Sequence, residues 1–199
     1  MLLSEIYRNF FKQAMALTAL VESTTILCDL KSCVIREMCI VRLHDNWARY
    51  CRELIIVSSY GKPVTETGIT VPQAPNIKRR QDVIPLLLSR YLRQRYEPHW
   101  HFPNESLRAA RLLGIRNFGA VNSGLSISPS PIDDLTDLRN YLVHKRYETI
   151  LNVQQIKRNL LLPISLKPDE LIISVIPPGV TVFRKWVTEL TQLAHSSIQ

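Results

Sequence analysis

The chain has 199 residues, of which 46% are hydrophobic and 21% are charged, and its formal net charge is +8. This length suits one domain with a sizeable core and is short for two, and the composition is not that of a disordered or fibrous protein. The positive charge suits an anionic partner, either nucleic acid or an acidic protein surface.

Neither a membrane span nor a secretory signal is expected. No stretch approaches the roughly 18 uncharged apolar residues that a span needs, and the start of the chain has no basic segment leading into an apolar one. The four cysteines, at positions 28, 33, 39 and 51, include no Cys-x-x-Cys pair and have no paired histidines nearby, which argues against a zinc site. We therefore expect a cytoplasmic protein with reduced cysteines, no metal and no cofactor.

Two long helices are predicted at the start of the chain. Apolar residues recur at spacings of three and four from Glu5 to about Cys28, and again from Ser32 to about Val57. Neither stretch contains Pro or Gly, so both helices are expected to be uninterrupted and to form an antiparallel hairpin. Trp47 and Trp186 are expected in the core.

Residues 59–130 are predicted to be an irregular insertion, because Gly and Pro are frequent in its first half. The C-terminal part returns to strong helical periodicity. Together these patterns predict a single all-α domain over residues 1–199, a bundle of about five helices. The predicted elements after the hairpin are a loop with a short strand pair at 59–80, helices at 81–96 and 105–113, a loop at 123–131, one helix from Ile132 to about Asn159, an extended piece at 169–176 and a last helix after Gly179.

The helix predicted from Ile132 carries the most informative polar group in the sequence. Asn140 and His144 are four residues apart and therefore share a helix face. Arg139 lies five residues before His144, about 140° around the helix axis and about 7.5 Å along it. The long arginine side chain still allows both tips to reach a common point.

These residue types suit cleavage of a phosphodiester by the neighbouring 2′-hydroxyl. A histidine exchanges protons near neutral pH, a guanidinium stabilises charge on the phosphate oxygens, and an asparagine orients either group. The reaction needs the 2′-hydroxyl, so the expected substrate is RNA and no metal is required. The structural alternative is that Arg139 pairs with an acid such as Asp137 or Glu53, and that His144 is merely hydrogen-bonded on a helix face.

The pattern Arg139-Asn140-x-x-x-His144, on a late helix after a two-helix hairpin, resembles the HEPN superfamily (higher eukaryotes and prokaryotes nucleotide-binding domain). The likeness covers residues 1–58, including the stretch 43–54, and about 131–199. It implies an up-and-down bundle and a homodimer that brings the two motifs together. It also implies an endoribonuclease acting as a toxin or antiviral effector, with Arg139 and His144 catalytic and Asn140 supporting.

One departure from that pattern concerns inhibition. A subgroup of HEPN toxins carries a tyrosine two residues after the motif histidine, where a nucleotidyltransferase antitoxin modifies it. Here that position is Arg146, and the tyrosine is Tyr147. Silencing by this route is therefore in doubt, whereas another antitoxin or a defence-system partner protein stays open.

Several basic residues are predicted to hold the RNA backbone, with a simple solvated surface as the alternative. His44 and Asp45 either line the same cleft as the motif or form a buried polar contact. Two rival functions stay open: a non-catalytic HEPN module that binds a partner protein or nucleotide, and a plain helical nucleic-acid binder that does not need His144. The predicted RNA-binding residues are Lys145, Arg146, Arg79, Arg80, Arg90 and Arg93.

Overall fold

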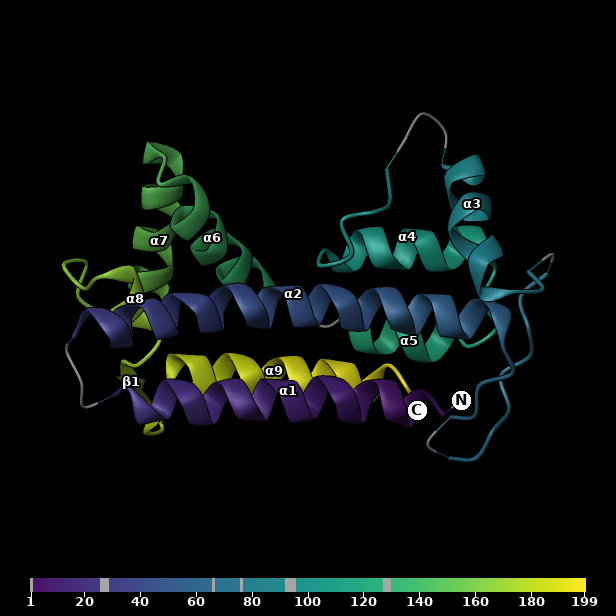
Figure 1. The fold of residues 1–199 in the computed structure, drawn as a ribbon, viewed down its shortest axis with the longest axis horizontal. Helices are drawn as coiled ribbons and strands as arrows, with labels where there is room; N and C mark the ends of the chain where they lie inside the picture. The colour runs from purple at the N-terminus through teal and green to yellow at the C-terminus, as the bar shows by residue number, and fades with distance from the viewer. Residues whose placement is uncertain (1, 26–28, 66, 76, 92–95, 127–129) are drawn as a thin grey trace. The chain divides into compact units, whose positions relative to one another are not determined.

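The structure, a computed structural model, describes residues 2–25, 29–65, 67–75, 77–91, 96–126 and 130–199 (Figure 1). Within these ranges the chain forms nine helices and one two-stranded sheet, so the predicted all-α class is confirmed. There are more helices than the about five expected, because α5 and α8 were not predicted and the late helix is divided into α6 and α7. The elements are α1 (Leu3–Ser23), α2 (Leu30–Tyr60), α3 (Arg80–Arg90), α4 (Pro103–Leu113), α5 (Phe118–Leu125), α6 (Ser130–His144), α7 (Tyr147–Asn159), α8 (Pro168–Leu171), β1 (Val175–Ile176), β2 (Val180–Thr181) and α9 (Val182–Ser196).

The chain divides into two compact units. Unit 1 comprises Met1–Phe11, Asn46–Pro129 and Thr191–Gln199, and unit 2 comprises Lys12–Asp45 and Ser130–Leu190. The boundaries cut through α1, α2 and α9, so each unit contains a part of each of these helices.

The core of unit 1 is built around an aromatic cluster. The rings of Phe10, Trp47 and Tyr50 contact one another, with centroids 5.2 to 5.8 Å apart. The Tyr50 hydroxyl donates to the carbonyl of Ala194, with an oxygen–oxygen distance of 2.7 Å, and Trp47 Nε1 donates to the carbonyl of His101 at 3.1 Å. These bonds satisfy the polar ends of two rings that are otherwise in an apolar core.

The insertion in unit 1 is more helical than its Gly and Pro content suggests. Helix α5 was not predicted, and the loop predicted at 123–131 is wrong for residues 123–125, which belong to α5, and for residues 130–131, which belong to α6. Gly124 in α5 lies so close to the C-terminal segment that an added Cβ would be 2.5 Å from Ser197 Cβ. The strand pair expected at 59–80 is reduced to isolated bridges of Val64 with Leu2 and with Thr70.

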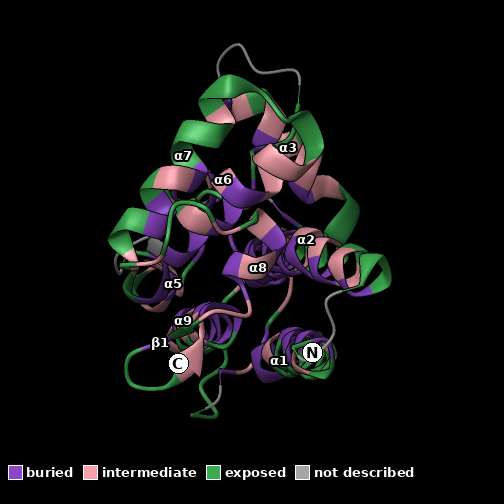
Figure 2. Cartoon of the chain, turned by 90° about the vertical axis from the view of Figure 1, so that its left-hand side faces the viewer, coloured by how far each residue is buried: buried purple, intermediate pink, exposed green. Residues whose placement is uncertain are grey.

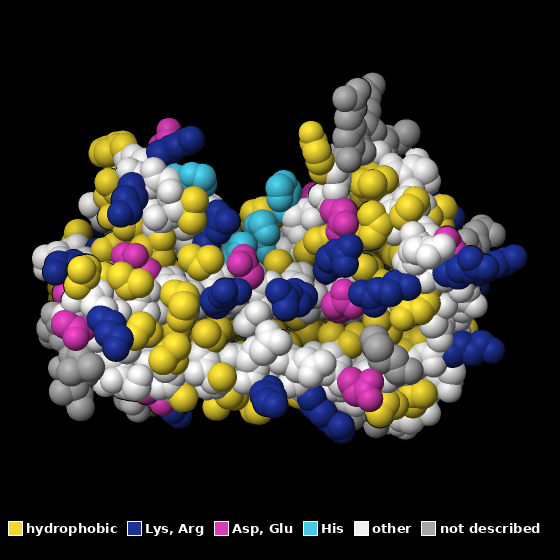
Figure 3. Space-filling view, viewed as in Figure 1, with side chains coloured by type: hydrophobic (Ala, Val, Ile, Leu, Met, Phe, Trp, Pro, Cys, Tyr) yellow, Lys and Arg dark blue, Asp and Glu magenta, His cyan; other side chains and the backbone are white. Residues whose placement is uncertain are grey.

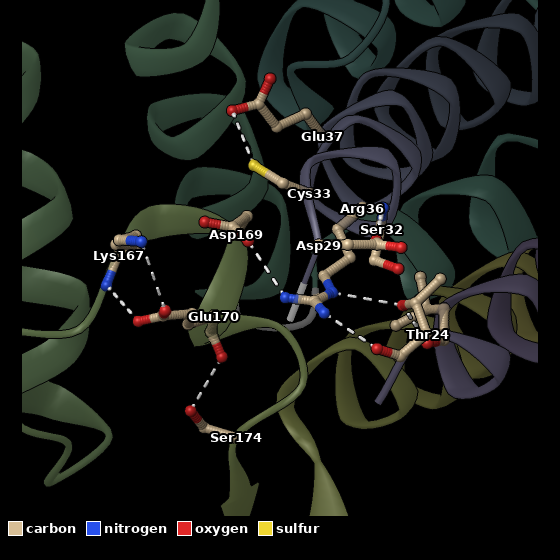
Figure 4. A network of polar contacts seen from close by, with 11 residues as sticks. Thr24, Asp29, Ser32, Cys33, Arg36, Glu37, Lys167, Asp169, Glu170 and Ser174 are labelled. Atoms are coloured by element: carbon tan, nitrogen blue, oxygen red, sulfur yellow. Dashed lines mark hydrogen bonds and ion pairs between the residues drawn. The ribbon is translucent and has the colours of Figure 1, made fainter. Parts of the chain in front are cut away.

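Unit 2 contains a buried ionic network around Arg36 of α2 (Figure 4). The Arg36 guanidinium lies 3.1 Å from an Asp169 oxygen of α8, and it donates to the hydroxyl and the carbonyl of Thr24 at the end of α1. Arg36 and Asp169 are 3% and 5% exposed. Breaking such a buried pair leaves an uncompensated charge, so the network holds these three segments together.

A second feature of unit 2 is the pair of helices α6 and α7, which pack side by side (Figure 1). The prediction of one continuous helix from Ile132 to Asn159 is wrong, because the chain leaves helical geometry at Lys145, whose φ is +48°. Arg146 is extended and precedes the first residue of α7. The two helices are also joined by Asn152, whose amide donates to an Asp137 oxygen at 2.8 Å.

Several other expectations can be compared with the described residues. Trp47 and Trp186 are fully buried, as predicted. Cys33, Cys39 and Cys51 are free thiols, whereas Cys28 lies outside the described residues. The segment predicted to be extended at 169–176 contains α8 and the short strand β1. None of the helices in the described ranges is both long enough and apolar enough to cross a membrane.

Candidate functional site

The motif predicted from the sequence lies at the C-terminal end of α6. His144 is the last residue of this helix, and the N–H of Lys145 donates to the carbonyl of Tyr141 at 2.8 Å. The left-handed conformation of Lys145 therefore caps α6, in the position that glycine usually takes. The three residues from His144 to Arg146 are all exposed.

Arg139 and Asn140 form the inner part of this site. Arg139 Nη1 donates to Asn140 Oδ1 at 3.3 Å, and both side chains are half-buried. Arg139 Nε is buried without a hydrogen-bond partner, and no carboxylate of the described residues forms an ion pair with this guanidinium. The acids that the structural alternative named have other partners: Asp137 accepts from Asn152, and Glu53 accepts from Arg80. Arg139 is therefore a half-buried cation whose charge is available to an anion.

His44 of α2 is a further part of the site within unit 2. Its side chain is buried, and Nδ1 lies 3.5 Å from an Asp45 oxygen. Burial lowers the pKa of His44, and the nearby positive charge of Arg139 lowers it further, against the opposing effect of Asp45. The imidazole is therefore neutral at pH 7, so it leaves the charge of Arg139 unopposed by a second cation.

Carboxylates surround the start of α6. Burial raises the pKa of Asp134 to about 6, while the charge of Lys185 on α9 lowers it and those of Asp137, Asp133 and Glu189 raise it. Asp133, Asp134 and Asp137 place negative charge on the N-terminal half of α6, where it interacts favourably with the helix dipole. The acids and the motif thus occupy opposite ends of one helix.

Of the four other predicted RNA-binding residues, the three that the structure describes lie in unit 1. Arg79 and Arg80 line a pocket beside α2, and Arg80 Nη2 lies 2.6 Å from Glu53. The Arg90 guanidinium donates to the carbonyl of Leu112 at the end of α4, which is a helix-capping contact. Arg93 lies outside the described residues.

Arg52 was not predicted to bind RNA. It lines the same pocket as Arg79 and Arg80, on a face where basic side chains lie beside acidic ones (Figure 3). No sequence signal identifies it, because Arg52 and Arg79 come together only through the packing of α3 on α2. Among the described residues, no group of three or more His, Cys, Asp or Glu is placed to hold a metal ion.

Comparisons of the chain with protein-family models, with curated proteins and with solved structures found no match.

Proposed function

We propose that this protein is a metal-independent endoribonuclease of the HEPN type, in which Arg139, Asn140 and His144 act on RNA. The proposal rests mainly on the burial and the hydrogen-bond partners of Arg139. It is half-buried, bonded to Asn140 and without a carboxylate partner among the described residues, on a helix that ends in the exposed His144. An arginine held in this way is suited to grip a phosphate.

The chemistry follows from these groups. The His144 imidazole takes the proton of the 2′-hydroxyl, whose oxygen attacks the adjacent phosphorus. Arg139 stabilises the negative charge that develops on the non-bridging oxygens, and Asn140 orients Arg139. A histidinium then protonates the departing 5′-oxygen, leaving a 2′,3′-cyclic phosphate and a 5′-hydroxyl. Two subunits would supply two copies of His144, one for each proton transfer.

A homodimer is supported by apolar surface next to the motif. Val143, Tyr147 and Leu151 are 51%, 73% and 44% exposed, and they lie on adjoining turns of α6 and α7. Figure 2 shows the outer side of α7 as exposed. Exposed apolar groups gathered in this way are typical of contact surfaces. We place the enzyme in the cytoplasm of a prokaryote, as a toxin or antiviral effector with RNA as its substrate.

The test is cleavage of a mixed RNA in excess EDTA by the wild type and by two variants. His144→Ala should abolish cleavage while leaving the helical content unchanged, and the wild-type products should end in 2′,3′-cyclic phosphate. The matched control is His99→Ala, which removes an exposed histidine of unit 1 and should leave cleavage intact. Equal cleavage by wild type and His144→Ala would overturn the assignment.

The same apolar surface supports a second candidate, a non-catalytic HEPN module that binds a partner protein. In that case the wild type cuts no RNA, and binding of the partner depends on Tyr147 and Leu151 but not on His144. A pull-down from the source cell extract with wild type, His144→Ala and Leu151→Asp would separate this candidate from the enzyme.

A further inference from the structure

A pocket of about 390 Å³ lies in unit 1, outside the motif. Its volume falls within the range of small-ligand sites, which is roughly 300–1,000 Å³. It therefore has room for more than a bare phosphate. Side chains of α2 and of the start of α3 form its walls: Arg52, Ile56, Arg79, Arg80, Gln81 and Ile84.

The residues that line this pocket include three arginines and no acid, so the lining favours an anion. Three arginines line it, and two carboxylates pair with them: Glu97 accepts from Arg52 at 2.7 and 3.0 Å, and Glu53 accepts from Arg80 at 2.6 Å. Asp82, at the start of α3, adds a third carboxylate, which accepts from the Arg79 backbone N–H at 3.1 Å. No carboxylate of the described residues forms an ion pair with the Arg79 guanidinium, which is therefore the lining cation most available to a phosphate.

Glu97 and Glu53 also fix the positions of two arginine side chains in the pocket. Hydrogen bonds to Glu97 and Glu53 raise the pKa of Arg52 and of Arg80, so these side chains are held in place as cations. Helix α3 begins at Arg80, and its start is capped by Asp82, whose Oδ2 accepts the Arg79 backbone N–H at 3.1 Å.

We infer that this pocket binds one nucleotide of an RNA strand, with its phosphate on Arg79, Arg80 and Arg52. Ile56 and Ile84 supply an apolar wall for the sugar or base. Binding of the phosphate depends only on the pocket, whereas the choice of RNA over a free nucleotide rests on the proposed function. The pocket would give unit 1 a contact with substrate that does not involve Arg139 or His144.

The experiment measures binding rather than cleavage, with the full chain carrying His144→Ala. A fluorescein-labelled ten-nucleotide RNA is titrated in EDTA at several salt concentrations, and its anisotropy is followed. Arg79→Gln should weaken binding at least fivefold and reduce the slope of log K against log salt by about 0.7, the value for one phosphate contact of a single strand. Arg158→Gln is the matched control, an exposed arginine on α7 with the same charge change, and should weaken binding less than twofold.

A variant that removes an acid of the pocket should have the opposite effect on RNA binding from one that removes an arginine. Glu53→Gln frees Arg80 and should tighten RNA binding at least threefold, whereas Glu148→Gln, an exposed acid of α7, should not. The inference is overturned if Arg79→Gln behaves like Arg158→Gln, or if Glu53→Gln tightens binding no more than Glu148→Gln. Because the Arg79 guanidinium forms no ion pair among the described residues, its variant reports on binding even if Glu53→Gln folds poorly.

A competition experiment distinguishes RNA from a nucleoside monophosphate or inorganic phosphate as the ligand of the pocket. Under the inference, a nucleoside monophosphate displaces the RNA only at a far higher concentration than unlabelled RNA. Arg79-dependent binding of a nucleoside monophosphate or inorganic phosphate without binding of RNA would overturn the RNA assignment. If Arg79-dependent RNA binding is found but the wild type cuts no RNA, the inference stands and the proposed enzyme falls.

Discussion

The charge of Arg139 and the burial of His44 together determine which of these two side chains is charged at pH 7. A charged histidine beside Arg139 would repel it and compete for the same anion. The burial of His44 lowers its pKa and so keeps the imidazole neutral at pH 7. Of these two residues, only Arg139 therefore carries a positive charge at pH 7.

Asp134 is the residue for which a dependence on pH is expected. Burial raises its pKa to about 6 in the folded protein, above the unfolded value of 3.8. The folded state therefore binds this proton more tightly, and the contribution to stability falls as pH rises from about 4 to about 6. Asp134→Asn should raise the free energy of unfolding at pH 7 by about 1 kcal/mol, after allowance for partial solvent screening.

The measurement is urea unfolding of wild type and Asp134→Asn at pH 4 and pH 7. The gain should be present at pH 7 and absent at pH 4, where the wild-type carboxyl is protonated. Glu148→Gln, an exposed acid, provides the control and should change stability little at either pH. A loss of stability at pH 7 would mean that attraction to Lys185 outweighs the cost of burial.

The turn between α6 and α7 depends on a residue that is not a glycine. Lys145 adopts φ of +48°, which costs a non-glycine residue roughly 1 kcal/mol. Lys145→Gly should therefore raise the free energy of unfolding by about 0.5–1 kcal/mol, as measured by denaturant titration. Arg146→Gly is the matched control, because Arg146 is extended and gains nothing from glycine. If both variants lose stability equally, the left-handed cap does not carry strain.

The contact of α5 with the C-terminal segment depends on the absence of a side chain at Gly124. An added Cβ would lie 2.6 Å from the Ser197 nitrogen and 2.7 Å from the Leu193 oxygen, and backbone atoms cannot easily move away. Gly124→Ala should lower the free energy of unfolding by about 1–3 kcal/mol. Gly119→Ala in the same helix meets nothing within 4 Å and should be neutral or stabilising. Thermal unfolding of the two variants, followed by circular dichroism, tests this contrast.

The elements that could be predicted from the sequence are those with long apolar periodicity. α1, α2 and α9 lie where spacings of three and four placed them, and α2 runs without interruption for 31 residues. α5 was missed because Gly119, Asn122 and Gly124 have low helix propensity, which packing overrides. The break at Lys145 was missed because the left-handed residue carries no glycine signal.

On the scale of the whole molecule, the division into two units was not predictable, because α1, α2 and α9 cross its boundaries without any change in composition. The single domain over residues 1–199 stays a prediction. The motif was accessible from the sequence because its residues are neighbours on one helix. The pocket of Arg52 and Arg79 was not, since those residues are joined only by tertiary packing.

Assembly is the prediction that belongs to this scale. If the exposed apolar residues of α6 and α7 form a homodimer, Leu151→Asp should shift the protein to monomers at micromolar concentration, because it places a charge in the contact. Leu161→Asp is the control, since Leu161 is 91% exposed in the turn after α7. Sedimentation velocity measures the outcome, and a wild type that is monomeric at every concentration would contradict the dimer.

The buried cysteines allow local opening of the two units to be measured separately. Cys51 lies in unit 1 and Cys39 in unit 2, and both are fully enclosed. Burial raises the pKa of Cys39 to about 11 and that of Cys51 further, so neither thiol reacts with a disulfide reagent while its surroundings are folded. The rate at which each thiol is modified under native conditions therefore reports how often its own unit opens. A single chain with its natural cysteines thus contains a kinetic probe of local opening in each unit.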